Sequence, residues 1–562
     1  MMKNIIERWK SYSKLDKDLK TELEGMNEEA LQDAFYKDLE FGTGGMRGKI
    51  GPGTNRMNIY TIRKANLGFA QYLLEQSDSP SVVIAHDNRH KSKEFAKESA
   101  CVLAQQGIHV YLFDGLRPTP ELSFAVRELD ATGGIVVTAS HNPPEYNGYK
   151  IYDQDGCQLV PKYADQVIAN VNAIEDVFDI ESLPFETARK KGFITIIGDA
   201  IDQAYIKSVL DIQLSPNMDK TIKIVFTPLH GTSARIGLDT LTVAGYDVYP
   251  VTEQMTPDPN FSTVDSPNPE NKEAFNMAIE KGKEVDADLL IATDPDADRL
   301  GIAVKHNKEY QLLTGNQTGA ILVHYLLKKR QEQGTLPQKG MVYNTIVTSE
   351  FGATIAKDFG MDVKSTLTGF KFIGEQAKLI EDTDYEFVFG YEESYGYVIQ
   401  DFVRDKDSIQ ALLLASEVAQ AKALEGKTLY DYLLELYETY GYYYEDLVNI
   451  RLEGKSGEER ITNILSTFRE EKPQTIAGKT VVQYEDYLTQ EGMKDDQSYR
   501  LELPKSNVLK FFLDDGSWFV LRPSGTEPKL KIYIGVVGDD LAHAKTLNED
   551  IKRDVLALIN NI

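Results

Sequence analysis

The stretch VVIAHDNRHKSKEFAKESACVLAQQGIHVYLFD, residues 82–114, indicates the fold class. It begins with the apolar run VVIAHD (82–87) and ends with HVYLFD (109–114), and both runs have the composition of buried strands. Between them, KEFAKESACVLAQQG (93–107) has the spacing of a helix and ends at Gly107. A strand, a helix and a strand in succession predict an α/β unit with parallel strands.

Strand-like runs alternate with helical patterns over most of the chain. GIVVT (134–138) continues the first set, DLLIAT (288–293) belongs to a second, and YEFVFG (385–390) belongs to a third. Further strands are expected at residues 222–227, 246–251 and 341–347. From about Tyr443 onward, strand-like segments and a helical tail indicate a smaller α+β domain, and the first 25 residues have the pattern of one amphipathic helix. We therefore expect three related α/β domains, at residues 1–205, 206–318 and 319–440, and a C-terminal α+β domain at residues 441–562.

Charge and composition limit the partners of the protein. The net charge of −26 over 562 residues disfavours nucleic acid and anionic membrane surfaces. The sequence has no 18 consecutive apolar residues, so no spanning helix is expected. Its two cysteines, Cys101 and Cys157, form no disulfide framework or metal pair, and a cytoplasmic location is expected. An anionic small molecule remains a possible ligand if the positive charge is gathered at its site.

The most unusual loops follow strand-like runs. They are TASHNP after GIVVT, DPDADR after DLLIAT, YEESYG after YEFVFG, and RPSGTEP after SWFVL. Ligands of open α/β sheets bind outside the carboxyl ends of the strands. We therefore expect these four loops, one from each domain, to meet around one cleft.

The DPDADR loop has the composition of a metal site. Hard oxygen ligands at Asp294, Asp296 and Asp298 suit Mg²⁺ or Ca²⁺. A calcium loop starting at Asp294 would need glycine where Arg299 stands and glutamate where Lys305 stands, so that pattern fails. Mg²⁺ is the expected ion, and a solvated acidic turn is the alternative.

Ser140, in TASHNPPEYNGYK (138–150), is the candidate nucleophile. Thr138 and Asn142 stand where a hydrolase elbow would have glycine, so hydrolysis is disfavoured. A serine that exchanges phosphate fits better, and it needs cations and a proton shuttle nearby. The candidates for the shuttle are Lys150, His141 and Arg299. A turn-holding role for the histidine and a charge-clamp role for the lysine stay open.

Two glycine-containing segments have features of phosphate sites. FGTGGMRGK (41–49) is not a Walker A loop, but as a loop it offers backbone N–H groups and Arg47 to an oxyanion. RPSGTEPKLKIY (522–533) has the composition of a phosphate socket, with a forked donor, two hydroxyls and a glycine. Those four residues are Arg522, Ser524, Gly525 and Thr526.

The segment GYEESYGY (390–397) suits a sugar. Glu392 and Ser394 combine a carboxylate with a hydroxyl, which can read sugar hydroxyls, although exposed glutamates are more often only solvated. The alternative is therefore an ordinary surface loop.

Together and in this order, the five motifs resemble those of the alpha-D-phosphohexomutase family. TASHNP looks like its phosphoserine loop, DPDADR its magnesium loop, GYEESYG its sugar loop, RPSGTEP its phosphate loop and FGTGGMRG its N-terminal loop. The resemblance spans about residues 40–535. It implies four domains around a deep central cleft and reversible transfer of phosphate between O1 and O6 of a hexose. It further implies one Mg²⁺ per chain and glucose 1,6-bisphosphate as intermediate and activator.

The resemblance also implies roles for single residues. Ser140 would carry the phosphate and contribute an oxygen to the metal, whose other ligands would be Asp294, Asp296 and Asp298. The residues that would line the reacting centre are Arg47, His141, Lys150 and Arg299, and Arg89 would be a further site residue with no stated role. The residues that would hold the sugar phosphate are Thr368, Gly369, Glu392, Ser394, Lys406, Arg522, Ser524, Gly525 and Thr526.

The motif EES inside the sugar loop resembles the form of glucose-preferring members of the family, so glucose is the expected sugar. Mannose or pentose phosphates and synthesis of the bisphosphate itself are the rival activities. A non-catalytic sugar-phosphate-binding protein is the rival from another class, and the intact Ser140 and aspartate triplet disfavour it. Monomer and dimer stay open.

Overall fold

The computed structural model describes residues 2–42, 45–452, 454–524 and 529–562. These residues form two compact units. The first unit comprises Met1–Gly315 and Phe370–Leu429, and the second comprises Asn316–Gly369 and Tyr430–Ile562.

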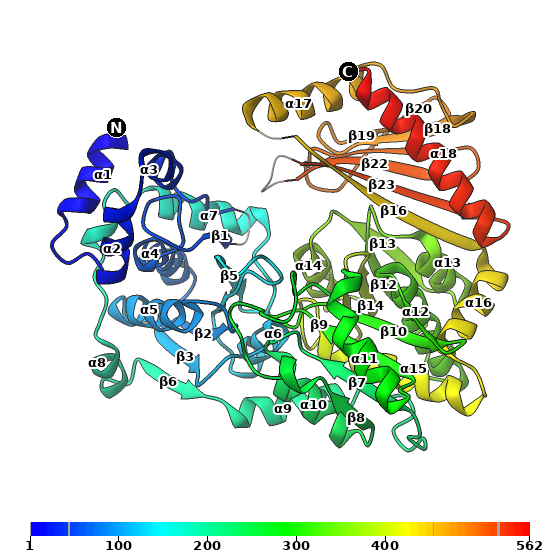
Figure 1. Ribbon diagram of the computed structural model, residues 1–562, viewed down its shortest axis with the longest axis horizontal. Coiled ribbons are helices and arrows are strands. Elements are labelled where there is room, and N and C mark those ends of the chain that lie inside the picture. Colours follow the sequence, from blue (N-terminus) through cyan, green and yellow to red (C-terminus); the bar gives the residue numbers. More distant parts are fainter. Residues whose placement is uncertain (1, 43–44, 453, 525–528) are drawn as a thin grey trace. The chain divides into compact units, whose positions relative to one another are not determined.

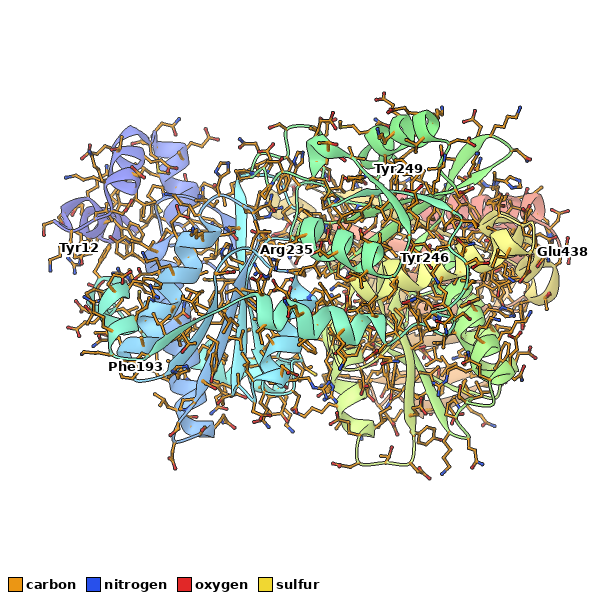
Figure 2. All side chains as sticks on the ribbon, turned by 90° about the horizontal axis from the view of Figure 1, so that it is seen from below. Tyr12, Phe193, Arg235, Tyr246, Tyr249 and Glu438 are labelled. Atoms are coloured by element: carbon orange, nitrogen blue, oxygen red, sulfur yellow. The ribbon has the colours of Figure 1, made fainter. Side chains whose placement is uncertain are left out.

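The first unit begins with three short helices, α1 (Met2–Ser11), α2 (Lys17–Gly25) and α3 (Glu28–Phe35). The expectation of one amphipathic helix over the first 25 residues was wrong. Asp16 ends it, because its carboxylate accepts hydrogen bonds from the backbone N–H groups of Asp18 and Leu19 and starts a new helix. Tyr12, labelled in Figure 2, lies in the connection between α1 and α2 and stacks on Phe178.

A six-stranded sheet follows, with the strand order β1-β5-β4-β2-β3-β6. Four neighbouring strands, β4, β2, β3 and β6, are parallel. Strand β5 is antiparallel to β4, and β1 is antiparallel to β5. The strands are β1 (Gly45–Lys49), β2 (Ser81–His86), β3 (His109–Phe113), β4 (Gly133–Val137), β5 (Tyr146–Asp153) and β6 (Ile194–Ile197). Its helices are α4 (Ile59–Gln76), α5 (Ser92–Gln105), α6 (Thr119–Glu128), α7 (Pro161–Asn172), α8 (Phe185–Lys190) and the 3-10 turn η1 (Val177–Asp179).

The strand, helix and strand expected at residues 82–114 are confirmed as β2, α5 and β3 (Figure 1). Ile84 and Leu112 of these strands pack with Phe95 and Leu103 of α5 in one buried core. FGTGGMRGK was expected to be a loop, but its second half is strand β1. Gly45 makes this pairing possible, because a Cβ there would meet the carbonyl oxygen of Tyr149 at 2.0 Å.

A second, five-stranded sheet of the first unit has the order β11-β10-β9-β7-β8. Strands β7, β8 and β9 are parallel, and β10 turns back antiparallel to β9. The strands are β7 (Lys223–Thr227), β8 (Asp247–Pro250), β9 (Leu289–Thr293), β10 (Leu300–His306) and β11 (Glu309–Leu312). The accompanying helices are α9 (Asp199–Leu210), α10 (Ser233–Val243), η2 (Thr252–Gln254), η3 (Lys272–Phe275) and α11 (Asn276–Val285).

The remaining segment of the first unit contains α14 (Phe370–Ile380), the hairpin of β14 (Glu386–Glu392) and β15 (Gly396–Val398), and α15 (Ser408–Leu424). The strand expected at residues 385–390 therefore runs two residues further, and Glu392 lies at its end rather than in a free loop. Helix α15 is buried around almost its whole circumference, as a helix in the middle of a large protein must be.

The second unit contains the parallel pair β12 (Gly340–Thr345) and β13 (Asp362–Thr366), with α12 (Gly315–Glu332), α13 (Glu350–Asp358) and α16 (Leu429–Tyr440). Its larger sheet has the order β16-β23-β22-β21-β18-β19-β20, and β17 pairs with β18. These strands are β16 (Tyr442–Arg451), β17 (Thr475–Ile476), β18 (Lys479–Asp486), β19 (Glu491–Lys494), β20 (Gln497–Arg500), β21 (Leu509–Leu513), β22 (Trp518–Pro523) and β23 (Lys529–Gly538). Helices α17 (Gly454–Glu470) and α18 (Leu541–Asn560) complete it.

The apolar sides of α17 and α18 pack against this sheet, with Ile464, Ile551 and Val555 in one core with Phe519 and Ile532. A C-terminal α+β arrangement is thus confirmed. No helix in the described part of the chain combines the length and the apolar character that crossing a membrane requires.

Candidate active site

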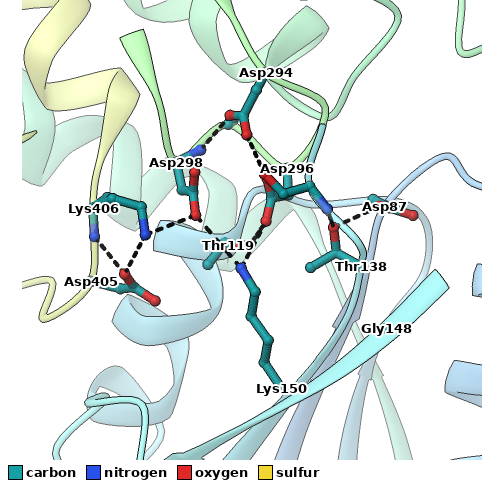
Figure 3. Close-up of polar contacts among 12 residues, drawn as sticks. Asp87, Thr119, Thr138, Gly148, Lys150, Asp294, Asp296, Asp298, Asp405 and Lys406 are labelled. Carbon is teal, nitrogen blue, oxygen red and sulfur yellow. Dashed lines mark hydrogen bonds and ion pairs between the residues drawn. The ribbon is translucent and has the colours of Figure 1, made fainter. Parts of the chain in front are cut away.

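Ser140 lies in the loop that follows β4, and hydrogen bonds that involve Thr138 and Asp87 hold its backbone in place. Its φ of 52° is in the left-handed region, which costs a residue other than glycine about 1–2 kcal/mol. Its N–H donates to Thr138 Oγ1 at 2.9 Å, and that hydroxyl donates to Asp87 Oδ2 at 2.7 Å. Thr138 and Asp87 are drawn in Figure 3. These bonds hold Ser140 in a conformation that the chain would otherwise avoid.

Arg89 holds the same loop from the other side. Its guanidinium donates to the carbonyl oxygens of Ser140 at 2.5 Å, Pro143 at 2.8 Å and Tyr146 at 3.1 Å, and also to that of Asn142. The side chain is fully buried, and Asp87 at 3.4 Å balances its charge. Arg89 therefore holds the backbone of the serine loop, a role that the resemblance did not specify.

The aspartates of the DPDADR loop converge beside Ser140. Asp294, Asp296 and Asp298 are buried, and one carboxylate oxygen of each lies within 4.8 Å of the others. The Ser140 hydroxyl donates to Asp294 Oδ2 at 2.6 Å. Burial, together with the two neighbouring carboxylates, raises the pKa of Asp294 well above its ordinary value. Three carboxylates held this closely are stable only with cations beside them.

The donor set of this triplet fits a divalent cation. Within the described ranges, Asp296 Oδ1 and Asp298 Oδ1 are buried oxygens that accept no hydrogen bond. Buried carboxylate oxygens without a donor are rare in proteins, and metal coordination satisfies them. Three hard oxygen ligands in a small cluster are the set that Mg²⁺ prefers.

Two lysines form ion pairs with the aspartate triplet (Figure 3). Lys150 Nζ is 3.0 Å from Asp296 Oδ2 and 3.6 Å from Asp298 Oδ2, and Lys406 Nζ is 3.1 Å from Asp298 Oδ2. Burial lowers the pKa of Lys150, but the Asp296 and Asp298 carboxylates outweigh it, so the pKa lies above its ordinary value. The pKa of Lys406 is raised in the same way. Both lysines are therefore cations at neutral pH.

The other expected members of the reacting centre are also in the first unit. His141 Nδ1 is 3.2 Å from Ser140 Oγ, and burial, followed by the charges of Arg299 and Arg47, holds the pKa of this histidine well below its ordinary value. Arg47, on β1, donates to Asn142 Oδ1 at 2.8 Å. The imidazole is therefore neutral at pH 7 and can accept a proton.

The sugar loop lies next to the metal loop. Arg299 and Gly396 form a backbone bridge, and the N–H of Leu300 donates to the carbonyl of Tyr395 at 3.0 Å. Burial lowers the pKa of Arg299, but its ion pair with Glu270 outweighs this, so the guanidinium stays charged. Glu392 is buried at the end of β14, and its carboxylate is among the charges that raise the pKa of Arg299. Ser394 is half-buried in the same loop.

Four expected substrate residues lie in the second unit, and two lie outside the described residues. Thr368 and Gly369 end the segment after β13. Arg522 lies on β22 and donates to the hydroxyl of Tyr533 at 3.3 Å, and the N–H of Ser524 donates to the carbonyl of Lys529 at 2.8 Å. The expected phosphate-site residues Gly525 and Thr526 lie outside the described residues.

Sequence reasoning missed several residues that hold the site. Asp87 follows β2 as the other polar loops follow their strands, so its position was a signal that could have been used. Asp405 accompanies Lys406 at 3.5 Å. Thr119, at the start of α6, donates to Asp296 Oδ2 at 3.0 Å, but nothing in its local sequence indicates a partner 177 residues away.

Comparison with known proteins agrees with this geometry. Four domain families match the chain in succession, described as phosphoglucomutase/phosphomannomutase alpha/beta/alpha domains I (38–178), II (203–308) and III (314–440) and C-terminal domain (447–553). The chain belongs to the phosphoglucomutase/phosphomannomutase family. The expected fold class, with three α/β domains and a C-terminal domain, and the resemblance to the phosphohexomutases are confirmed. The protein is therefore a phosphohexomutase, an enzyme of the isomerase class.

Similar proteins in this family include phosphoglucomutases of Staphylococcus aureus. The protein of strain MRSA252 is 40% identical over 533 residues, which are 94% of this chain and 94% of that protein. The protein of strain USA300 is 41% identical over 510 residues, or 90% and 91% of the two chains.

Solved structures of the family share the fold. A putative phosphomannomutase from Thermus thermophilus superposes with a TM-score of 0.69 at 23% identity, covering 93% of this chain and 99% of that chain. The open form of parafusin, a phosphoglucomutase from Paramecium, superposes with a TM-score of 0.68 at 18% identity, covering 93% and 95%.

Proposed function

We propose that the protein is a phosphoglucomutase, which interconverts alpha-D-glucose 1-phosphate and glucose 6-phosphate through a phosphorylated Ser140. The observation that carries the proposal is the 2.6 Å bond between Ser140 Oγ and Asp294 Oδ2. It places the candidate phosphate carrier directly beside a buried aspartate triplet in a family of sugar-phosphate mutases.

The proposed cycle has two phosphoryl transfers. In the first, the bond between phosphorus and Ser140 Oγ breaks and a bond forms to the free hydroxyl oxygen of a bound glucose monophosphate. The proton of that hydroxyl is released, and Ser140 Oγ regains one. The resulting glucose 1,6-bisphosphate reorients in the site. It then returns its other phosphate to Ser140 by the same step in reverse. Because such transfers need positioning and charge balance above all, a rigid serine loop is what the reaction requires.

The metal ligands would be Ser140, or its phosphate, and the aspartates Asp294, Asp296 and Asp298. Mg²⁺ bound there would offset the negative charge of the transferring group. Lys150, with its raised pKa, acts as a charge clamp on Asp296 and Asp298.

His141 is the best-placed proton carrier for Ser140. Its Nδ1 lies within hydrogen-bond distance of Ser140 Oγ, at 3.2 Å, and the imidazole is neutral because its pKa is lowered. Arg47 and Arg299 would supply positive charge to the transferring phosphate, since both guanidiniums are near enough to the histidine to lower its pKa.

The substrate would be read at both ends. Glu392 and Ser394 would bind sugar hydroxyls, Lys406 the sugar phosphate, and Thr368, Gly369, Arg522, Ser524, Gly525 and Thr526 the phosphate that is not reacting. The domain boundaries 1–205, 206–318, 319–440 and 441–562 are part of this proposal. A cytoplasmic location accords with the two free buried cysteines, Cys101 and Cys157.

Glucose is favoured over the rival sugars because the Staphylococcus aureus relatives named above are phosphoglucomutases at about 40% identity over nine-tenths of the chain. The test is turnover of glucose 1-phosphate, mannose 1-phosphate and ribose 1-phosphate, each with and without glucose 1,6-bisphosphate. We expect the highest kcat/KM with glucose 1-phosphate and activation by the bisphosphate. A clear preference for mannose or ribose 1-phosphate would contradict the glucose assignment, and no turnover of any of them would contradict the mutase itself.

A further inference from the structure

Three helices begin at the backbone of the metal loop. The carbonyl oxygens of three consecutive residues, Pro295, Asp296 and Ala297, each accept a hydrogen bond from a residue at a helix N-terminus. The three helices are α10, α6 and α15. They come from segments of the first unit that are far apart in the sequence.

Helix α10 holds the first carbonyl. The N–H of Thr232, the residue before the helix, donates to the carbonyl of Pro295 at 2.8 Å. Gly231 allows this approach, because a Cβ at that position would lie 2.4 Å from Pro295 Cα. The two backbones can therefore approach each other only because residue 231 has no side chain.

Helix α6 holds the second residue twice. The N–H of Thr119, its first residue, donates to the carbonyl of Asp296 at 2.9 Å, and Thr119 Oγ1 donates to Asp296 Oδ2 at 3.0 Å. Thr119 lies beside Asp296 in Figure 3. The second bond fixes the direction of the carboxylate itself.

Helix α15 holds the third residue. Ser408 Oγ donates to the carbonyl of Ala297 at 2.6 Å, and the N–H of Ser408 lies 3.3 Å from the same oxygen. Ala297 has a φ of 57°, in the left-handed region. The loop backbone is therefore strained at the residue to which Ser408 donates its hydrogen bonds.

These contacts affect the aspartates in two ways. The first N–H groups of a helix have no partner within the helix and carry its positive partial charge, so three converging N-termini stabilise a loop with three carboxylates. They also hold the backbone of the loop on which Asp296 and Asp298 stand. Asp296 Oδ1 and Asp298 Oδ1, which are buried and have no hydrogen bond in the described ranges, are available to a cation.

We propose that Thr119 and Ser408 are positioning residues of the metal loop, which set its affinity for Mg²⁺ without touching the sugar phosphate. The inference rests on the proposed function in one respect, that the aspartate triplet binds Mg²⁺. Partners that orient metal ligands are commonly worth about 10- to 100-fold in metal affinity.

The experiment compares Thr119→Val and Ser408→Ala with the wild-type protein. Titration calorimetry with MgCl₂ on the metal-free full chain is expected to show a Kd for Mg²⁺ raised about 10-fold in each variant. The Mg²⁺ concentration that half-activates turnover should rise equally, while kcat at saturating Mg²⁺ and KM for the sugar phosphate change little. Thr119→Ser keeps the hydroxyl and should restore the wild-type Kd.

Matched controls remove hydroxyls that do not reach the loop. Ser416→Ala, in the same helix as Ser408, deletes a buried hydroxyl bonded to the carbonyl of Leu412 at 2.7 Å. Thr240→Val does so in α10, where the hydroxyl bonds to the carbonyl of Ile236 at 2.7 Å. Both should bind Mg²⁺ as the wild type does, even where their unfolding temperature falls.

The outcomes separate the two proposals. An unchanged Kd for Mg²⁺ in both Thr119→Val and Ser408→Ala would overturn the positioning role, and so would an equal loss in the Ser416→Ala control. Mg²⁺ binding by a wild-type protein that turns over no hexose phosphate would contradict the proposed function alone. A wild-type protein that binds no Mg²⁺ would contradict both.

Discussion

The hydroxyl of Ser140 donates a 2.6 Å hydrogen bond to Asp294, a residue 154 positions further along the chain. This bond joins the loop after β4 to the loop after β9 and therefore the first sheet to the second. A phosphate on Ser140 would enter a place already lined by the carboxylates of Asp296 and Asp298 and by the cations that balance them. Because the contact with Asp294 brings the serine to these carboxylates, a phosphate on Ser140 would need positive charge beside it.

Asp296→Asn should reduce kcat at least about 100-fold with Mg²⁺ present. The change removes one negative ligand from the triplet, and stabilisation of charge in the transition state is commonly worth several kcal/mol. Steady-state kinetics measures it, with Asp239→Asn, an exposed aspartate of α10, as the control. Unchanged turnover in Asp296→Asn would refute the role of this carboxylate.

Arg89→Lys should lower kcat about 10-fold or more and leave KM for the sugar phosphate nearly unchanged. A lysine cannot reproduce a planar fork that reaches several carbonyl groups of the serine loop at once. Arg63→Lys, which alters an ion pair with Glu98 between α4 and α5, is the control. A raised KM at constant kcat would instead assign Arg89 to substrate binding.

Lys150→Arg should keep turnover within about 10-fold of the wild type, whereas Lys150→Met should lose about 100-fold. The reason is that a charge clamp needs a cation beside Asp296, and arginine provides one, although it cannot exchange a proton near neutral pH. If Lys150 were the proton shuttle, the arginine variant would lose as much as the methionine variant, because shuttles contribute about 10²–10⁴-fold. The kcat values of the two variants decide between these roles.

Glu121→Gln should flatten the fall in stability between about pH 5 and about pH 8. Glu121 is buried in α6, with the charges of Arg117, Arg235, Asp407 and Asp114 around it, and burial raises its pKa from 4.5 to about 8. The folded protein therefore keeps a proton that the unfolded chain releases. This stabilisation is complete below pH 4.5 and is lost as the pH rises through about 8, at up to about 1.4 kcal/mol per pH unit.

Thermal unfolding across this pH range measures the effect of Glu121. Glutamine stays neutral, so the variant should gain stability relative to the wild type as the pH rises. Glu128→Gln, at the exposed end of the same helix, is the control. A constant difference between Glu121→Gln and the wild type at all pH values would show that the carboxyl does not titrate in this window.

The sequence predicted those parts of the molecule that depend on local pattern. Strand-like runs and their following loops placed Ser140 and the aspartate triplet correctly at the ends of β4 and β9. The break at Asp16 and the strand at Gly45–Lys49 were missed, because a capping side chain and a pairing with β5 outweigh local composition.

The long-range contacts could not be read from the sequence. Thr119 and Ser408 look like ordinary helix starts, and only the folded chain brings them to Asp296 and Ala297. Arg89 was expected in the site without a stated role, and only the structure shows that its Nη1 and Nη2 groups donate to backbone carbonyls of the serine loop. The chemistry of the residues thus indicated which of them belong to the site. It was a poorer guide to the contacts that each of them makes.

The central claim is that Ser140 carries the phosphate, and intact-mass analysis of the purified protein tests it most directly. After incubation with glucose 1,6-bisphosphate, the wild-type protein should gain the mass of one phosphate, and Ser140→Ala should gain none and lose nearly all turnover of glucose 1-phosphate. A Ser140→Ala protein that still takes up one phosphate or keeps normal turnover would contradict the account.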